Sequence, residues 1–257
     1  MYSNDGPANG WKSGHFCALG MRVRLTKGCG PRRAENDPAE WPAPKRAVGN
    51  DLDVYHHGVN PVTTFILAGG KSSRMGEDKA FLELGGRTLL ARALELAGAV
   101  GGSVCIVGGA EKYTSFSPVV EDIYPGRGPL AGIHAALART CTDLNLIMAV
   151  DLPLLQSCFL NFLISQAIET TALVVVPRAG GGLQPLCAVY HRSFAEVAER
   201  SLRAGKNKID LLFAEVETRV IEPEELAQNG FSSEIFRNLN TRRDWEEARL
   251  QVPAELA

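Results

Sequence analysis

The sequence lacks the long hydrophobic runs from which membrane-spanning helices are built. No apolar run reaches the ~18 residues that a span requires, and the first residues hold no compact apolar segment of the kind found in signal peptides. An excess of one charge sign is also missing, because 27 lysines and arginines stand against 29 aspartates and glutamates, for a net charge of −2. We therefore expect a cytoplasmic protein with no membrane partner and no nucleic-acid partner.

Cysteine pairs at the spacing of metal or redox motifs are absent as well. The 257-residue chain has six cysteines, and no two of them form a C-x-x-C motif. Several lie in apolar runs, where cysteine usually behaves as a small buried hydrophobe. We expect a reduced protein without a cysteine-based metal site.

The first 60 residues differ in composition from the rest of the chain. Glycine, proline and charged residues dominate them, and only residues 21–25 could form a short strand. Such a composition cannot bury enough apolar surface to offset the entropy lost on ordering the chain. We predict a disordered extension over residues 1–60, with a targeting or partner-binding arm as the alternative, and a folded domain over residues 61–257.

Within the folded domain, short apolar runs alternate with segments of helical period. The expected strands are 65–68, 104–107, 119–121, 144–150, 173–177 and 218–221, and the expected helices lie near 89–97, 129–137, 158–169 and 192–203. Residues 178–190 are expected to form a flexible loop that returns into a strand. Thr88 is a candidate N-cap for the first of these helices. The strands are continuously apolar rather than alternating, which suits a parallel sheet covered on both faces. The sequence therefore predicts an α/β fold with a mostly parallel central sheet.

A basic, glycine-rich loop follows the first expected strand. Its order from Leu67 to Lys79 is L-A-G-G-x-x-x-R-M-G-x-x-K, which matches neither the P-loop nor the G-x-G-x-x-G spacing. Gly69 and Gly70 let backbone N–H groups approach an anion, and Arg74 and Lys79 add positive charge. This chemistry suits a nucleoside triphosphate, and the alternative is an ordinary strand-to-helix turn with surface cations.

Asp151 directly follows the most strand-like run of the chain, 144–150. An aspartate at the carboxyl end of a buried parallel strand reaches the edge of the sheet where ligands bind. Its carboxylate can hold Mg²⁺, which takes few protein oxygens and completes its shell with phosphate and water. The alternative is an N-cap for the helix that follows.

Three further motifs lie along the chain. D-x-x-P-G-x-G-P-L-A-G-I begins at Asp122, G-x-x-Q-P-L-x-A-x-Y ends at Tyr190, and F-x-N-x-N-T-x-x-D begins at Phe236. Each also has an interpretation without a ligand. The first would be a Gly-Pro turn, the second would contain a structural glutamine and tyrosine, and the third would be an N-cap turn in which Thr241 caps the last helix.

Together the four motifs resemble those of the molybdenum cofactor guanylyltransferases, which belong to the nucleotidyltransferase superfamily. The resemblance spans about residues 63–248 and implies a three-layer, Rossmann-like nucleotide-diphospho-sugar transferase fold. It implies an enzyme that transfers GMP from GTP to the terminal phosphate of molybdenum-bound molybdopterin and releases pyrophosphate. The product is the molybdopterin guanine dinucleotide cofactor.

The resemblance also implies roles for individual residues. Lys79, Arg74 and Asp151 would be catalytic, with Mg²⁺ on Asp151 offsetting the repulsion between the reacting phosphates. Asp122 would accept a hydrogen bond from a guanine N–H edge or a ribose hydroxyl. The full nucleotide site would comprise Leu67, Ala68, Gly69, Gly70, Lys79, Asp122, Gly128, Pro129, Leu130 and Asp151. The acceptor site would comprise Gln184, Pro185, Asn238 and Asn240. Insertion chaperones or apo-oxidoreductases would be the protein partners, beside GTP and Mo-molybdopterin.

One departure from the family pattern concerns the nucleotide specificity. Family members often place an asparagine just after the second strand, where this chain has Val107, Gly108 and Gly109. A cytidylyltransferase of the same cofactor and a sugar- or polyol-phosphate nucleotidyltransferase therefore stay open as alternatives. A cofactor-handling scaffold without catalysis is a further alternative, which the presence of Lys79 and Asp151 disfavours.

Overall fold

The computed structural model describes residues 62–69, 78–239 and 242–251. The chain divides into two units, Met1–Ala43 and Pro44–Ala257, and all described residues belong to the second. The predicted extension over residues 1–60, with its possible strand at 21–25, lies outside the described residues, so its disorder stays a prediction.

A mixed, mostly parallel sheet forms the centre of the domain. Its strands are β1 (Val62–Leu67), β4 (Ser103–Val107), β5 (Val119–Val120), β6 (Leu144–Ala149), β7 (Val174–Ala179), β8 (Gly182–Leu183), β9 (Cys187–His191) and β10 (Thr218–Ile221). The order is β10-β7-β9-β6-β1-β4-β5, with β8 paired to β7. Strand β9 runs antiparallel to β6 and β7, β8 runs antiparallel to β7, and the remaining neighbours are parallel. The predicted fold class is confirmed.

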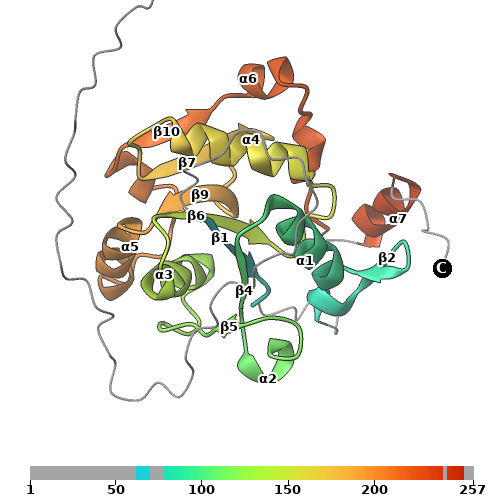
Figure 1. Cartoon of the computed structure of the whole chain (residues 1–257), viewed down its shortest axis with the longest axis horizontal. Helices are drawn as coiled ribbons and strands as arrows, with labels where there is room; N and C mark the ends of the chain where they lie inside the picture. The colour runs from blue at the N-terminus through green and yellow to red at the C-terminus, as the bar shows by residue number, and fades with distance from the viewer. Residues whose placement is uncertain (1–61, 70–77, 240–241, 252–257) are drawn as a thin grey trace, which may run out of the picture. The chain divides into compact units, whose positions relative to one another are not determined.

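Helices cover both faces of this sheet and complete three layers. Helices α1 (Leu89–Val100) and α4 (Ser157–Ile168) share one apolar core with the sheet, and α3 (Pro129–Arg139) and α5 (Phe194–Arg203) share the other. Figure 1 shows α3 and α5 on the left of the sheet, with α4 above it and α1 to the right. Since both faces are covered, β6 is buried along its whole length, as its mainly apolar sequence predicts.

Short elements connect these layers. They are η1 (Lys79–Phe81), β2 (Glu83–Leu84), β3 (Arg87–Thr88), α2 (Ala110–Tyr113), η2 (Leu212–Ala214), α6 (Pro223–Gln228), η3 (Ser233–Phe236) and α7 (Arg242–Gln251). Strands β2 and β3 form a separate two-stranded sheet. Thr88 caps α1 as predicted, because its side chain accepts a hydrogen bond from the Ala91 N–H.

One expected loop is partly ordered secondary structure. The sequence predicts a flexible loop after residue 177, but β7 continues to Ala179 and turns back into β8. Gly180 and Gly181 have φ angles of 58° and 78°, which form the tight turn that lets the two strands pair. The loop prediction was wrong here because consecutive glycines are equally typical of a mobile loop and of a hairpin turn.

The strand order places the expected ligand edge near β1 and β6. After β1 the chain adds β4 and β5 on one side, and then crosses to the other side to add β6. In open α/β sheets, ligands bind at the carboxyl ends of the strands beside such a reversal. Ala68 and Gly69, which follow β1, and Asp151, which follows β6, all lie at this edge.

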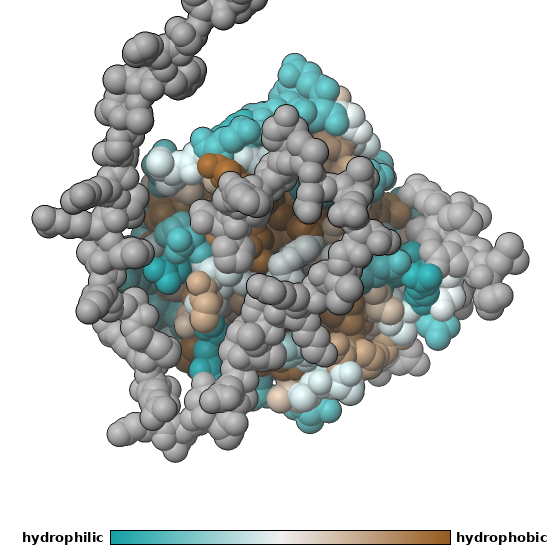
Figure 2. All heavy atoms as spheres, in the orientation of Figure 1, coloured by the Kyte–Doolittle hydropathy of each residue, from teal (hydrophilic) through white to brown (hydrophobic). Residues whose placement is uncertain are grey.

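Among the described helices, none combines the length and the apolar character needed to cross a membrane. Figure 2 shows hydrophilic side chains over β10 and α6, at the top of the view.

Candidate active site

An ion pair between Lys79 and Asp151 marks the ligand edge of the sheet. Lys79 is the first residue of η1 and Asp151 lies two residues beyond the end of β6. The Lys79 Nζ lies 3.3 Å from the Asp151 Oδ2, and the side chains are 23% and 21% exposed. The structure therefore brings together two predicted catalytic residues that are 72 positions apart in sequence.

The alternative role for Asp151, an N-cap for the following helix, is wrong. Helix α4 begins at Ser157, and its N-cap residue is Gln156. Asp151 instead keeps its carboxylate at the sheet edge, beside the Lys79 ammonium. A carboxylate held by one lysine there remains available to a cation or to a phosphate-bound metal.

The donor set at this edge fits Mg²⁺ that is shared with a substrate. In the part of the chain that the structure describes, no group of three or more His, Cys, Asp or Glu side chains could hold a metal ion by itself. Mg²⁺ at nucleotide sites commonly takes one or two carboxylates and completes its octahedron with phosphate oxygens and water. Asp151 suits that kind of partial site.

Backbone hydrogen bonds fix the start of the glycine-rich loop against both neighbouring strands. The N–H groups of Ala68 and Gly69 donate to the Val107 carbonyl, at 3.0 and 3.1 Å. The Leu67 carbonyl accepts from the Val150 N–H at 3.1 Å. These predicted nucleotide contacts are thus used within the fold to join β1 to β4 and to the end of β6. Gly70 and Arg74 lie outside the described residues.

The loop before α3 reaches the same edge. Gly128 has a φ angle of 75°, Pro129 is the first residue of α3, and Leu130 is fully buried. A side chain at Gly132 would contact Leu67 and Val107 at 3.3 and 3.4 Å and lie 3.7 Å from the Asp122 Oδ1. The Asp122 carboxylate therefore lies close to the ends of β1 and β4.

Burial of the Asp122 carboxyl raises its pKa above the ordinary value. The residue as a whole is exposed, and it is the inward-facing carboxyl that loses water to its neighbours. A carboxylate that is partly desolvated before any ligand arrives is a strong acceptor for an N–H or O–H donor. Its position suits the predicted contact with a base or ribose.

Two predicted acceptor segments lie beside Asp151. The Leu239 N–H donates to the Asp151 carbonyl at 3.3 Å. The exposed Asn238 directly precedes Leu239 and is therefore one residue away from a hydrogen bond to Asp151. The Ala149 N–H donates to the Leu186 carbonyl at 2.8 Å, which holds the segment containing Pro185 against the end of β6. Asn240 and Thr241 lie outside the described residues.

Gln184 and Tyr190 have structural partners. The Gln184 side chain donates to the carbonyls of Ala179 and Gly182, inside the β7–β8 turn. Tyr190 is fully buried, and its hydroxyl donates to the Pro185 carbonyl at 2.8 Å. The structural alternative accounts for Tyr190, while the Gln184 amide shapes the segment that carries Pro185.

Sequence reasoning missed three residues around Lys79. The Asp78 Oδ1 accepts from the Ala80 N–H at 3.1 Å and thereby caps η1. The Asp78 Oδ2 lies 3.1 Å from both the Lys112 Nζ and the Tyr113 hydroxyl. An aspartate just before a short helix is a recognisable cap signal, but nothing local in the sequence connects Tyr113 with Asp78.

A second missed group fastens the loop that carries Asp122. The Tyr124 hydroxyl donates to the Glu199 Oε1 at 3.2 Å and accepts from the Arg203 Nε at 3.3 Å. The Tyr124 ring packs edge-on against His134, which is buried on α3. These contacts attach the loop to α3 and α5, although Tyr124 looks like an ordinary loop residue in the sequence.

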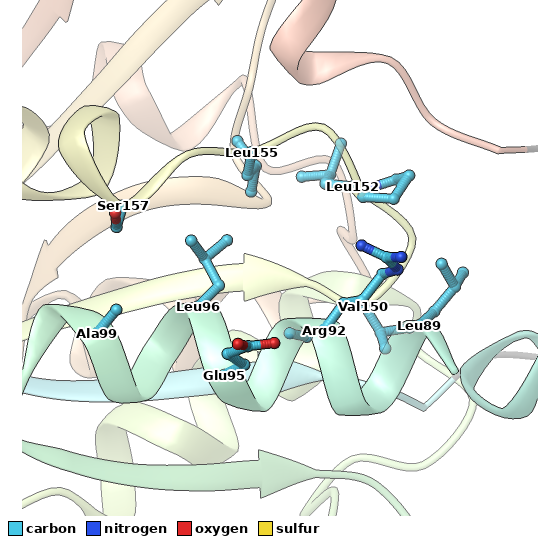
Figure 3. Close-up of a pocket in the computed structure, with 11 residues that line it drawn as sticks. Leu89, Arg92, Glu95, Leu96, Ala99, Val150, Leu152, Leu155 and Ser157 are labelled. Atoms are coloured by element: carbon cyan, nitrogen blue, oxygen red, sulfur yellow. The ribbon is translucent and has the colours of Figure 1, made fainter. Parts of the chain in front are cut away.

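A mainly apolar groove of about 290 Å³ lies between α1 and residues 150–157. Figure 3 shows Leu96 on α1 facing Leu155 across it, with the Arg92 guanidinium near Leu152. Arg92 donates to the Leu84 carbonyl through Nε and Nη2, at 2.9 and 2.7 Å, which gives this cation a structural function. The groove approaches the site at Val150, and neither Lys79 nor Asp151 lines it.

Comparison with known proteins identifies relatives along most of this domain. The family model described as "MobA-like NTP transferase domain" matches residues 64–218. A probable molybdenum cofactor guanylyltransferase from Carboxydothermus hydrogenoformans is 35% identical over 186 residues, which cover 72% of this chain and 93% of that protein. A molybdenum cofactor guanylyltransferase from Desulfosudis oleivorans is 35% identical over 199 residues, which cover 76% of this chain and 98% of that protein.

Solved structures agree with the sequence relatives. The molybdopterin-guanine dinucleotide biosynthesis protein A of Archaeoglobus fulgidus superposes with a TM-score of 0.66 at 26% identity, covering 74% of this chain and 97% of that one. The 2-C-methyl-D-erythritol 4-phosphate cytidylyltransferase of Thermus thermophilus shares the fold at 16% identity, with a TM-score of 0.54, covering 73% of this chain and 96% of that one. On the family match and the close sequence relatives, this chain belongs to the MobA-like NTP transferase family.

Proposed function

We propose that this protein transfers GMP from GTP to the terminal phosphate of molybdenum-bound molybdopterin, with release of pyrophosphate. The observation that carries the proposal is the Lys79–Asp151 pair at the reversal point of the sheet. Relatives named as molybdenum cofactor guanylyltransferases, with more than 90% of their length covered, support the substrate assignment.

The chemistry needs charge compensation more than it needs a general base. The attacking group is a phosphate and is already anionic, so the barrier comes mainly from its repulsion by the α-phosphate of GTP. The Lys79 ammonium would contact the phosphates as a point charge, and the loop after β1, with Arg74, would surround them. Fixed positive groups stabilise the charge that builds up on the transferring phosphoryl group without reorganising during the reaction.

Asp151 would hold Mg²⁺ together with oxygens of the triphosphate. A bound Mg²⁺ supplies Lewis-acid polarisation of a phosphoryl oxygen and neutralises charge on the leaving pyrophosphate. Lys79, at 3.3 Å from the Asp151 carboxylate, keeps this carboxylate oriented toward the site edge. Asp122 would accept a hydrogen bond from the base or ribose.

The acceptor would approach from the side of β9 and the segment before α7. Asn238 and Pro185 belong to backbone segments that are hydrogen-bonded to residues next to, or at, Asp151. A ligand held by these segments would lie beside the Lys79–Asp151 pair, as an in-line displacement at the α-phosphate requires. The product would pass to an insertion chaperone or an apo-oxidoreductase in the cytoplasm, and capture of neither by the tagged protein in a cell extract would contradict this step.

The test is GMP transfer and nucleotide binding with matched aspartate variants of one strand. Asp151 follows the carboxyl end of β6, and Asp143 precedes its amino end and pairs with Arg192 at 2.9 Å. Asp151→Ala should lower kcat by about 10²- to 10³-fold, the range found when one group that stabilises developing charge is removed. Asp143→Ala removes the same side chain from an exposed ion pair and should leave kcat within about twofold, since such pairs contribute little.

The assay compares GTP with CTP, using Mo-molybdopterin as the acceptor and Mg²⁺ in the buffer. GTP turnover that is lost in Asp151→Ala and kept in Asp143→Ala supports the proposal. A preference for CTP would assign the protein to the sister cytidylyltransferases. Turnover with a sugar or polyol phosphate would show that this compound, and not Mo-molybdopterin, is the acceptor. If no triphosphate binds, the scaffold alternative replaces the enzyme.

A further inference from the structure

A single tyrosine hydroxyl contacts both described ends of the glycine-rich loop. The Tyr113 hydroxyl lies 3.1 Å from the Ala68 carbonyl, just before the loop, and 3.1 Å from the Asp78 Oδ2, just after it. Tyr113 is the last residue of α2, 45 and 35 positions from these partners, and it is 1% exposed. A buried hydroxyl with two oxygen partners is held in place more firmly than a surface one.

We propose that Tyr113 and Asp78 form a clamp that positions Lys79 for the triphosphate. The inference rests on the proposed function, because it assumes that Lys79 binds phosphates. Neither residue needs to contact the substrate, so both are positioning residues. The clamp connects Ala68 to Asp78, and Lys79 directly follows Asp78.

The two oxygens of Asp78 act on different parts of the loop base. The Oδ1 accepts from the Ala80 N–H and fixes the first turn of η1, which carries Lys79. The Oδ2 accepts hydrogen bonds from the Tyr113 hydroxyl and from the Lys112 ammonium. Lys112 partly neutralises the Asp78 carboxylate, which otherwise would repel a triphosphate bound nearby.

Gly108 makes room for the clamp. A side chain at this position would lie 2.7 Å from the Tyr113 ring, which is closer than any real contact of this kind. The ring therefore fills the volume that the residue after β4 would otherwise use. The glycine and the tyrosine therefore form one structural unit in this chain.

The clamp acts on Lys79, which would contact the phosphates, and among the described residues it makes no hydrogen bond to the loop of Asp122, which would contact the base or ribose. Its contacts are with Ala68, Asp78 and Lys112, whereas the loop of Asp122 is fastened separately through Tyr124. Loss of the clamp should weaken ligands in proportion to their contacts with Lys79. GTP depends on these contacts through three phosphates and GMP through one.

The experiment measures the Kd of GTP and of GMP by calorimetry, on the full chain with Mg²⁺ present. Tyr113→Phe removes only the hydroxyl. We expect the Kd of GTP to rise about five- to tenfold, the size of one lost hydrogen bond, and the Kd of GMP to change by less than about twofold. Tyr190→Phe is the matched control, because it removes another buried hydroxyl bonded to a backbone carbonyl, and it should leave the ratio of the two Kd values unchanged.

Asp78→Ala is the second variant and keeps the test decisive if Tyr113→Phe does not fold. It removes both carboxylate oxygens, so neither the Ala80 N–H nor the Tyr113 hydroxyl keeps its Asp78 partner. We expect the same selective loss of GTP affinity. An equal loss for GTP and GMP, or no loss for either, would overturn the clamp. Wild-type protein that binds no GTP would instead overturn the proposed function, so the two failures are distinct.

Discussion

Two loops border the candidate nucleotide site, and a tyrosine hydroxyl fastens each of them in a different environment. Tyr113 is buried and joins Ala68 to Asp78 at the base of the glycine-rich loop. Tyr124 is half-buried and joins the Asp122 loop to the Glu199–Arg203 pair on α5, whose side chains are 37% and 70% exposed. The same side chain thus provides an internal anchor in one case and a surface attachment in the other.

The difference follows from what each loop has to hold. The glycine-rich loop would surround a highly charged triphosphate, so its ends need anchors that ligand charge and salt do not disturb. Buried hydrogen bonds satisfy this need because solvent cannot replace them cheaply. The Asp122 loop would contact a largely uncharged base and ribose, and a water-exposed attachment leaves it able to adjust.

The contrast is sharpest in the stability of the two Tyr→Phe variants. Tyr113→Phe removes the one O–H that the buried Ala68 carbonyl and the Asp78 carboxylate share, so the free energy of unfolding should fall by about 1–3 kcal/mol. Tyr124→Phe should lower it by less than about 1 kcal/mol, because its partners are open to water. Urea unfolding followed by circular dichroism gives both values from the midpoint and slope. Equal losses in the two variants would remove the proposed distinction.

Asp122→Asn tests how the stability contributed by the Asp122 carboxyl depends on pH. Burial raises the pKa of the Asp122 carboxyl in the folded state, so this group favours folding below its unfolded pKa and loses that contribution as the pH rises through the folded pKa. At neutral pH the charged carboxylate therefore opposes folding. Asp122→Asn should raise the melting temperature slightly near pH 7, and the gain should disappear as the pH falls through the ordinary carboxyl range.

The same variant should weaken GTP binding, because an amide is a poorer acceptor than a carboxylate. A gain in stability with a loss of affinity is the usual sign of a group kept for function. Glu224→Gln on the exposed side of α6 is the control and should change neither quantity. A gain that persisted at acidic pH would contradict the assigned cause.

The smallest expected effect is the salt dependence of the stability lost in Arg203→Gln. Arg203→Gln removes the exposed partner of Glu199 and of the Tyr124 hydroxyl. At low ionic strength this should lower the free energy of unfolding by at most about 1 kcal/mol, and the loss should shrink at 1 M salt, where the Debye length is about 3 Å. Tyr113→Phe should show no comparable salt dependence, and a similar response in both would count against the burial argument.

Much of the fold was predictable because burial leaves a local signal. The run 144–150 predicts β6 through its mainly apolar residues, and Thr88 predicts the start of α1 through its capping oxygen. Boundaries were less certain, since β1 begins at Val62, ahead of its expected start. The β7–β8 turn was missed because the pair Gly180 and Gly181 is compatible with both a tight turn and a loop.

In the candidate site, too, some residues are predictable from local sequence and others are not. Lys79 and Asp151 stand out in the sequence because a cation after a glycine-rich loop and a carboxylate after a buried strand are local patterns. Tyr113, Asp78 and Tyr124 carry no comparable mark. Their importance comes from partners 34 to 79 positions away, and only a folded chain can reveal those contacts.

The sequence by itself determined the layers of the fold and the residue types available at the ligand edge, since hydrophobic period, caps and glycines act over a few neighbouring residues. Only the tertiary structure decided that Lys79 meets Asp151, that Tyr113 closes the base of the loop, and that Gly108 leaves space for its ring. The physical reason is that these contacts depend on strand order and on close packing at the sheet edge. Both arise when distant segments are brought together, and neither is encoded in any single stretch of the chain.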